Sequence, residues 1–239
     1  MMSTNDPPRT MTLPRLRIDL LMLAACVALF TVFPTLDLDV AALMYDPASG
    51  FRWGDAPLVQ LSYQIFKAKV IGWVVIGLLL YLLAGWFGRR IPAARRRAAL
   101  FLLLMIVAGP ILLVNSGLKD HWGRARPIQV TQFGGERIYT PPLVPATQCD
   151  KNCSFVSGHA AAGFALIGVY WVTRRRRWLV AGIALGSAVG LGRMLQGAHF
   201  LSDIVFAFWA VYLTGAVLDR LMPITQTAAS AEGTRPENP

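Results

Sequence analysis

Long apolar segments separated by short polar ones dominate the chain. Six of these segments reach or approach the roughly 20 residues that an α-helix needs to cross a bilayer. The pattern therefore predicts an all-α integral membrane protein, a bundle of six transmembrane helices within residues 15–222. The predicted spans are about 16–36, 65–87, 98–118, 158–173, 178–195 and 199–221.

The two ends of the chain are polar and lack a hydrophobic period. Residues 1–14 and 223–239 are expected to form a disordered head and a disordered tail. The first span has a rival interpretation, because LAAC ending at Cys26 looks like a lipoprotein processing site. Asp19 interrupts the short hydrophobic region before it and apolar residues continue to Phe33, which favours an uncleaved helix.

Composition agrees with the membrane assignment. Hydrophobic residues make up 55% of the chain and charged residues only 15%, against about 25% in soluble domains. The net charge of +10 could suggest a nucleic-acid partner. However, the basic residues lie in short runs between apolar segments, as in cytoplasmic loops, so no nucleic-acid binding is expected.

Loop charges predict the orientation in the membrane. Six spans place both termini on one side. More than half of the 23 Lys and Arg residues lie in the amino terminus, the 88–97 link, the 174–177 turn and the carboxyl tail. The positive-inside rule makes these segments cytoplasmic. The 37–64 loop, the 119–156 loop and the 192–199 bend then face the periplasm, if the membrane is a bacterial inner membrane.

A pair of cysteines lies in the predicted outward loop. Cys149 and Cys153 are four residues apart, in a compartment where disulfides persist. We expect a disulfide that fixes the approach to residues 154–159. Closing so short a ring constrains the unfolded chain by only about 2 kcal/mol.

Three polar clusters stand at the outward ends of the predicted spans. They are residues 119–127, 154–159 and 193–203. Polar groups near spans are costly and need a reason. Four cations from these clusters could surround a multiply charged anion: Lys119, Arg124, Arg126 and Arg193. Ser157 and Gly158 open a predicted helix, where backbone N–H groups and the helix dipole favour phosphate.

Two histidines allow a nucleophile and a proton donor in the same site. Asp203 follows His199 by four residues, so a helix starting near His199 would place both on one face. One ring nitrogen could then donate to the carboxylate while the other attacks, and His159 could protonate a leaving group. The same polar residues also fit two other kinds of active site.

The first alternative is a metal site of His159, His199 and Asp203, which the surrounding cations oppose. The second is a serine hydrolase with Ser157 as nucleophile, but the Gly-x-Ser-x-Gly elbow is absent. No metal and no cofactor are therefore expected.

The clusters together resemble the three-part signature of the type-2 phosphatidic acid phosphatase family. The matching patterns are Lys119-x6-Arg126-Pro127, Ser157-Gly158-His159 and Arg193-x5-His199-x3-Asp203. Two positions depart from the family pattern. Gly192 stands where a Ser usually precedes the arginine, and Val156 where a Pro usually precedes the serine.

The resemblance implies a mechanism for the matching residues. His199 would attack phosphorus and form a phosphohistidine, with Asp203 orienting it, and His159 would protonate the leaving oxygen and then activate water. The remaining matched residues would bind the phosphate oxygens: Lys119, Arg126, Arg193, Ser157 and Gly158, with Arg124 as a further candidate.

A site at membrane level suits a phosphate carried by a lipid. The candidate substrates are lipid A, undecaprenyl pyrophosphate, phosphatidic acid and phosphatidylglycerol phosphate, and the SFVSGHA segment resembles bacterial lipid A phosphatases most. A lipid phosphotransferase with the same histidine chemistry stays open, as does a transporter of phosphorylated lipids. The sequence does not predict an oligomeric state.

Overall fold

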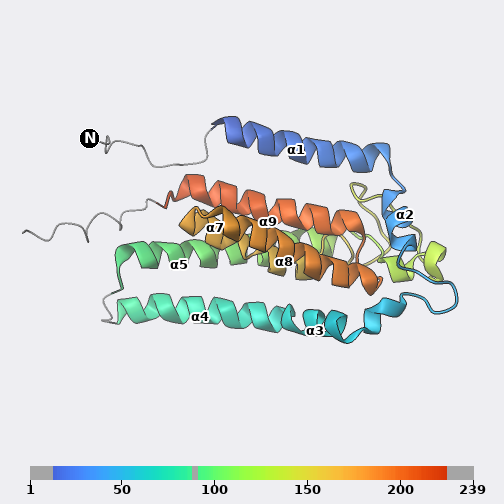
Figure 1. Ribbon diagram of the computed structural model, residues 1–239, viewed down its shortest axis with the longest axis horizontal. Coiled ribbons are helices and arrows are strands. Elements are labelled where there is room, and N and C mark those ends of the chain that lie inside the picture. The colour runs from blue at the N-terminus through green and yellow to red at the C-terminus, as the bar shows by residue number, and fades with distance from the viewer. Residues whose placement is uncertain (1–12, 88–90, 225–239) are drawn as a thin grey trace, which may run out of the picture.

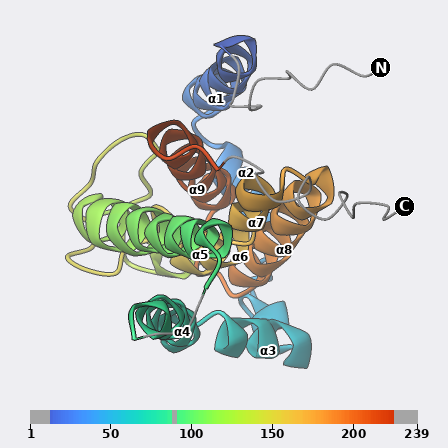
Figure 2. The same cartoon turned by 90° about the vertical axis from the view of Figure 1, so that its left-hand side faces the viewer.

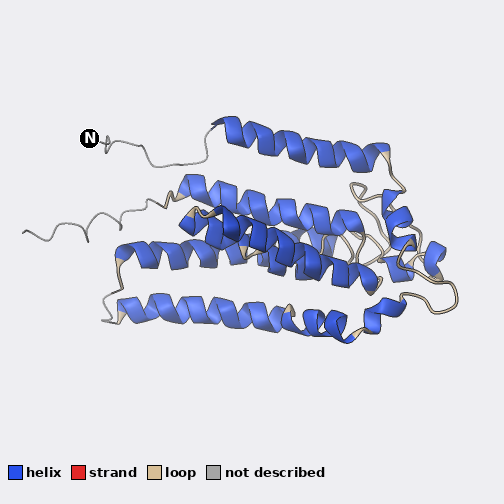
Figure 3. Ribbon diagram, in the orientation of Figure 1, coloured by secondary structure: helices blue, strands red, loops and turns tan. Residues whose placement is uncertain are grey.

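The computed structural model describes residues 13–87 and 91–224 of the 239-residue chain, so nearly all of the predicted head and tail lies outside the described residues. Within this part the secondary structure is helical and contains no strand (Figure 3). The all-α prediction is confirmed. The long helices run roughly along one common direction (Figure 1).

The helices follow one another with short breaks. Those before residue 120 are α1 (Leu13–Val32), α2 (Leu36–Ala42), η1 (Arg52–Asp55), α3 (Pro57–Ile65), α4 (Ala68–Trp86), α5 (Ala93–Ile106) and η2 (Val107–Lys119). Those after it are η3 (Pro127–Gln129), η4 (Thr131–Phe133), α6 (Gly158–Phe164), α7 (Ile167–Thr173), α8 (Arg176–Leu195) and α9 (Leu201–Leu221).

Four helical stretches of the described residues are long and apolar enough to cross a membrane. They are Pro57–Trp86, Ala93–Lys119, Arg176–Leu195 and Leu201–Leu221. A fifth is possible if α1 and α2, which are bent by 80° relative to each other, form one span. The pair α6–α7, Gly158–Thr173, is shorter. The protein is therefore a multi-pass membrane protein by length and composition, and the number of six spans stays a prediction.

Prolines explain two departures from the expected boundaries. Pro34 lies in the break between α1 and α2, where a missing N–H and a ring clash end a helix. Pro57 opens α3, because its fixed φ suits the first helical position. Helix α3 thus lies in a segment expected to be mainly loop, and the second span begins at residue 57 rather than near 65.

Helix α6 lies at the centre of the bundle, packed against α8, α9 and η2 (Figure 2). Glycines allow α6 and α8 to approach closely: a Cβ atom on Gly163 would lie 2.8 Å from the Cα of Gly186. Small residues at such contacts let helix backbones approach in membranes. Phe101, Phe164 and Trp171 fill the core around them. The first helical residues of α6 are therefore held rigidly.

The outer helices α1 and α4 expose apolar side chains. In α4 the rings of Trp73 and Trp86 are 70% and 85% exposed, and Leu21 in α1 is 69% exposed. Exposed apolar surface of this extent fits contact with lipid tails rather than water.

The two ends of the bundle differ in chemistry. The α4–α5 connection and the α7–α8 junction lie at one end, and the α8–α9 bend lies at the other (Figure 1). At the first end Arg174 pairs through both terminal nitrogens with the buried Asp219 of α9. At the second end lie the loops that carry the three polar clusters.

Candidate active site

The predicted site residues come from three separate helix ends. Lys119 is the last residue of η2, Ser157 and His159 lie at the start of α6, and Arg193 lies in the last turn of α8. Hydrogen bonds join these ends: the Ser157 N–H donates to the Asp203 carbonyl oxygen at 3.1 Å. The fold thus brings together residues that lie up to 84 positions apart between Lys119 and Asp203.

His199 lies in the bend just before α9, and not inside that helix. Its Nδ1 is 2.8 Å from the Ser154 carbonyl oxygen and 3.4 Å from Asp203 Oδ2. Both neighbours can only accept, so Nδ1 carries the proton and Nε2 keeps its lone pair. Nε2 is buried and has no partner among the described residues. The predicted i, i+4 relation to Asp203 holds although the helix begins two residues later.

Asp203 is held by several donors besides His199. Its Oδ2 accepts from the Ser154 hydroxyl at 2.5 Å and from the Phe200 N–H at 2.8 Å, and its Oδ1 accepts from Arg124 at 2.8 Å. The carboxylate is completely buried. It therefore caps the start of α9 and also fixes the His199 imidazole.

The prediction that Arg124 binds phosphate is not supported by its position. Its side chain is completely buried, and its nitrogens donate to protein acceptors at 2.7–2.9 Å. These acceptors are the Thr140 carbonyl oxygen, Ser202 Oγ, Asp203 Oδ1 and Asp37 Oδ2. Four of its five N–H donors are used within the protein, and the buried side chain does not line the cavity described below. Arg124 instead holds Asp203.

Asp37, Ser202 and Ser154 are parts of the site that sequence reasoning missed. Asp37 of α2 accepts from Arg124, from the Ser202 N–H at 2.9 Å and from the Ser202 hydroxyl. An acidic residue next to the proline break of an apolar segment could have signalled a buried partner, because an unpaired charge there is costly. Nothing in the sequence indicated which arginine it meets.

Apart from Arg124, three of the predicted cations are placed to bind an anion: Lys119, Arg126 and Arg193. Lys119 and Arg193 are each 7% exposed, and Arg126 lies within electrostatic range of both. One Arg126 nitrogen donates to the Asn152 carbonyl oxygen at 2.8 Å, and Arg193 donates to Gln196 Oε1. Both arginine side chains keep further N–H donors for a ligand. Like charges held this close repel one another, so an anion between them is favoured.

Unpartnered polar atoms mark where a ligand belongs. Five buried side-chain polar atoms of the described residues lack a hydrogen-bond partner, and three of them are Nε2 of His159, Nε2 of His199 and Nε of Arg193. Buried polar groups are nearly always paired, so such a cluster indicates a missing ligand. Two imidazoles and a guanidinium in this position can attack, protonate and neutralise a phosphate.

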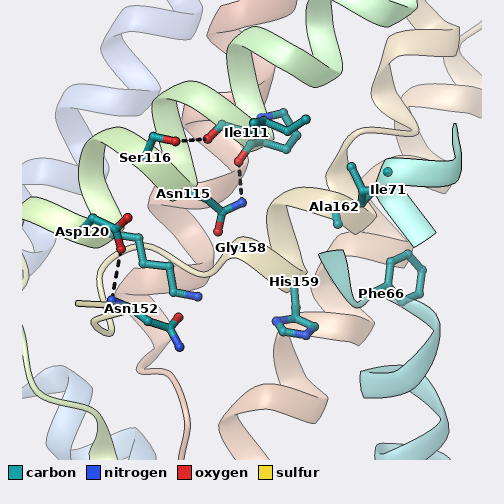
Figure 4. A pocket seen from close by; sticks show the side chains of 13 residues that line it. Phe66, Ile71, Ile111, Asn115, Ser116, Asp120, Asn152, Gly158, His159 and Ala162 are labelled. Atoms are coloured by element: carbon teal, nitrogen blue, oxygen red, sulfur yellow. Dashed lines mark hydrogen bonds between the residues drawn. The ribbon is translucent and has the colours of Figure 1, made fainter. Parts of the chain in front are cut away.

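A cavity of about 530 Å³ opens beside His159 (Figure 4). Lys119, Gly158 and His159 lie on its wall. Gly158 is needed there, because a Cβ atom would lie 2.4 Å from Asn115 Oδ1. The cavity has an apolar side and a polar side: Phe66, Ile71, Ile111 and Ala162 form the first, and Asn115, Ser116, Asp120 and Asn152 the second.

The π-helical winding of η2 shapes the polar side of this cavity. Pro110 lacks the N–H that a regular helix needs, and the Asn115 amide donates to the Pro110 carbonyl oxygen at 2.7 Å. Ser116 donates in the same manner to Ile111 at 3.2 Å. Such windings are frequent at functional sites. Here the winding ends at Lys119.

Cys149 and Cys153 form a disulfide with a Cα–Cα distance of 5.6 Å. The Cys153 N–H donates to the Lys119 carbonyl oxygen at 3.1 Å, and the next residue, Ser154, contacts both His199 and Asp203. The pair therefore holds the loop between the first and second clusters against the site.

We expect an acid limb near pH 4 in the dependence of kcat/KM on pH. Burial lowers the pKa of the His199 imidazole from 6.5 to about 4, and the contact with Asp203 raises it only in part. The attacking neutral form is then lost only as pH falls through about 4. The profile is measured with a lipid phosphate and corrected for the substrate's own ionisation near pH 6.

An alkaline limb is expected in kcat, since His159 must carry a proton in the substrate complex to serve the leaving group. A corrected acid limb at pH 6.5 would contradict the neutral state of buried His199. A flat profile would contradict the division of roles between the histidines.

An all-helical membrane protein with two imidazoles and several cations gathered beside a cavity has the features of a membrane phosphatase. Comparison with known proteins supports this class. The family model described as the PAP2 superfamily matches residues 98–225, more than half of the chain, and the chain belongs to this superfamily. No solved structure is significantly similar to it.

Characterised relatives extend over most of the chain. It is 38% identical to a lipid A 4'-phosphatase of Francisella tularensis subsp. novicida, over 81% of this chain and 89% of the relative. It is 31% identical to a lipid A 4'-phosphatase of Rhizobium leguminosarum, over 87% and 96%. Phosphatidylglycerophosphatase B of Escherichia coli K12 is 29% identical, over 66% and 75%. The predicted family and the enzyme class, a lipid phosphatase, are confirmed.

Proposed function

We propose that the protein removes a phosphate from a membrane lipid through a phosphohistidine on His199, at the periplasmic side of a bacterial inner membrane. The observation that carries this proposal is the group of three unpartnered buried nitrogens on His159, His199 and Arg193. A bound phosphate would accept from the Arg193 Nε–H and from protonated His159, and its phosphorus would face the lone pair of His199 Nε2. Lys119 and Arg126 supply further charge.

In the first step His199 Nε2 attacks phosphorus, and the bond from phosphorus to the leaving oxygen breaks. His159 gives its proton to that oxygen. The Nδ1–H of His199 stays bonded to Ser154 and Asp203, whose negative charge stabilises the cationic phosphohistidine. In the second step His159 takes a proton from water and the hydroxide attacks phosphorus. The bond from phosphorus to His199 Nε2 breaks, its electron pair returns to the neutral imidazole, and inorganic phosphate leaves.

Groups that the fold already holds in position would stabilise the negative charge on the phosphate oxygens. Lys119, Arg126 and Arg193 provide cations, and Ser157 with the Gly158 N–H provides the start of α6. Donors fixed in this way stabilise developing charge, and removing one typically lowers turnover by about 10²–10³. Burial, together with the same cations, opposes a proton on His159, whereas a bound phosphate dianion favours it.

Lipid A is the substrate we favour. Two relatives named as lipid A 4'-phosphatases match more than four fifths of the chain, and the cavity combines an apolar wall with amide, hydroxyl and carboxylate groups suited to a sugar headgroup. The phosphatidylglycerophosphatase relatives make phosphatidylglycerol phosphate the second candidate. The proposed orientation in the membrane rests on the charge of the loops. The site lies at the end of the bundle opposite the arginine-rich connections, which the positive-inside rule makes cytoplasmic.

The purified protein in detergent, with excess chelator, is expected to release inorganic phosphate from lipid A and faster than from phosphatidylglycerol phosphate or phosphatidic acid. Mass spectrometry of the lipid product should show the loss of one phosphate, at the 4' position. Activity abolished by the chelator and restored by one cation would support a metal site instead. Phosphate found on an acceptor lipid, without release, would identify a phosphotransferase, and binding without either product would favour a transporter.

A further inference from the structure

Tyr63 reaches the site from a helix outside the region matched by the family model. It lies on α3, whereas the match begins at residue 98. Helix α3 packs against α8, the helix that carries Arg193 (Figure 2). A residue of the amino-terminal half therefore takes part in a site whose motifs all lie in the other half.

The Tyr63 ring contacts two of the site's main groups at once. It stacks on the His159 imidazole with a centroid distance of 5.0 Å and an interplanar angle of 26°. The Arg193 guanidinium carbon lies 4.7 Å from the centroid of the same ring. Guanidinium and imidazole planes both pack favourably on aromatic rings. One ring thus fixes the proton donor and a phosphate-binding cation relative to each other.

Few other contacts orient these two side chains. Nε2 of His159 and Nε of Arg193 have no hydrogen-bond partner among the described residues. Within the described part of the chain, Arg193 donates a hydrogen bond to Gln196 Oε1. Aromatic packing is thus a main constraint on both planes in the empty site, and a misplaced catalytic group costs up to about 10²-fold in rate.

The absence of a side chain at Gly192 leaves space for the packing of Tyr63 on Arg193. A Cβ atom at residue 192 would lie 3.1 Å from Ser62 Oγ, tighter than an ordinary contact. Ser62 directly precedes Tyr63, and its hydroxyl donates to the Val59 carbonyl oxygen at 2.7 Å. The glycine at a position where the family usually has serine therefore lets α3 lie close to α8, and this brings Tyr63 over Arg193.

We propose that Tyr63 is a positioning residue that holds His159 and Arg193 in their working orientations, and that its ring rather than its hydroxyl does so. The inference rests on the proposed function for the roles of the two partners. It predicts that an aromatic ring without a hydroxyl can replace tyrosine, while a side chain of similar size without a ring cannot.

The test compares Tyr63→Phe, Tyr63→Leu and the matched control Tyr81→Leu, which alters an exposed tyrosine of α4. On a lipid phosphate, Tyr63→Leu should lower kcat by about 10–100-fold, while Tyr63→Phe and the control stay within about threefold of the parent. On p-nitrophenyl phosphate the loss should shrink, because an acidic leaving group needs less help from His159.

Binding of orthovanadate, measured by calorimetry, provides a readout that needs no turnover. Tyr63→Leu should weaken it by about tenfold through Arg193, and Tyr63→Phe should not. If the parental protein releases no phosphate from any lipid, the proposed function fails, yet the binding comparison still tests Tyr63. Unchanged binding and unchanged kcat in Tyr63→Leu would overturn the inference, as would equal losses in Tyr63→Phe and Tyr63→Leu.

Discussion

Replacing His199 by alanine is expected to lower the release of inorganic phosphate by on the order of 10⁴-fold or more, the usual consequence of losing a covalent nucleophile. The reason is geometric. Ser154 and Asp203 hold the Nδ1 side of the ring, so Nε2 points its lone pair at the phosphate site. The variant lacks that atom and leaves no comparable nucleophile in place.

The matched control is His121→Ala. His121 is exposed, and its Nδ1 contacts the Gly117 carbonyl oxygen at 2.9 Å, within its own helix end. Its loss should leave turnover within about threefold of the parental rate, because surface changes away from a site have small effects. Release at the parental rate by His199→Ala would show that another group attacks phosphorus.

Rapid-quench labelling separates the roles of the two histidines. The parental protein should carry an acid-labile phosphate during turnover, and His199→Ala should carry none. His159→Ala should still form the labelled intermediate from p-nitrophenyl phosphate and hydrolyse it slowly, because the water-activating base is missing. A label that persists in His199→Ala would contradict the assignment.

The motifs could be predicted from the sequence because each lies within a few residues at the end of an apolar segment. Spacing alone placed His199 four residues before Asp203, and hydropathy placed Lys119, His159 and Arg193 at helix ends. The structure places Lys119 and His159 on the wall of one cavity, with Arg193 and His199 within electrostatic range of His159. The helix start was less predictable: α9 begins at Leu201, because Asp203 caps it by accepting the Phe200 N–H.

Contacts between distant segments could not be predicted. Arg124 was grouped with the phosphate-binding cations because it lies two residues before Arg126, yet its side chain is completely buried against Asp37 and Asp203. Its partner Asp37 lies 87 residues away, and no local pattern links the two. Tyr63 was missed because its segment, residues 37–64, was expected to be a loop.

Arg124→Gln is expected to destabilise the protein by about 3–5 kcal/mol, the usual cost of removing one partner of a buried ion pair. Arg124 lies between two completely buried carboxylates, Asp37 at 2.7 Å and Asp203 at 2.8 Å. Without the guanidinium their charges face each other in a site that water does not reach. The free energy of unfolding in detergent measures the loss. A matched control is Arg52→Gln, since Arg52 and Asp46 form an exposed pair at 3.6 Å worth at most about 1 kcal/mol.

The double variant Arg124→Gln, Asp37→Asn isolates the cause. Asp37→Asn removes one of the two negative charges while keeping an acceptor for Ser202. The double variant should therefore lose less than the sum of the two single variants, by at least about 1 kcal/mol, whereas independent sites add within about 0.5 kcal/mol. Additive losses would mean that Arg124 acts by packing on Phe200 and Tyr139 and not through its charge. Because Asp203 also orients His199, Arg124→Gln should lower kcat at temperatures where the variant is still folded, and Arg52→Gln should not.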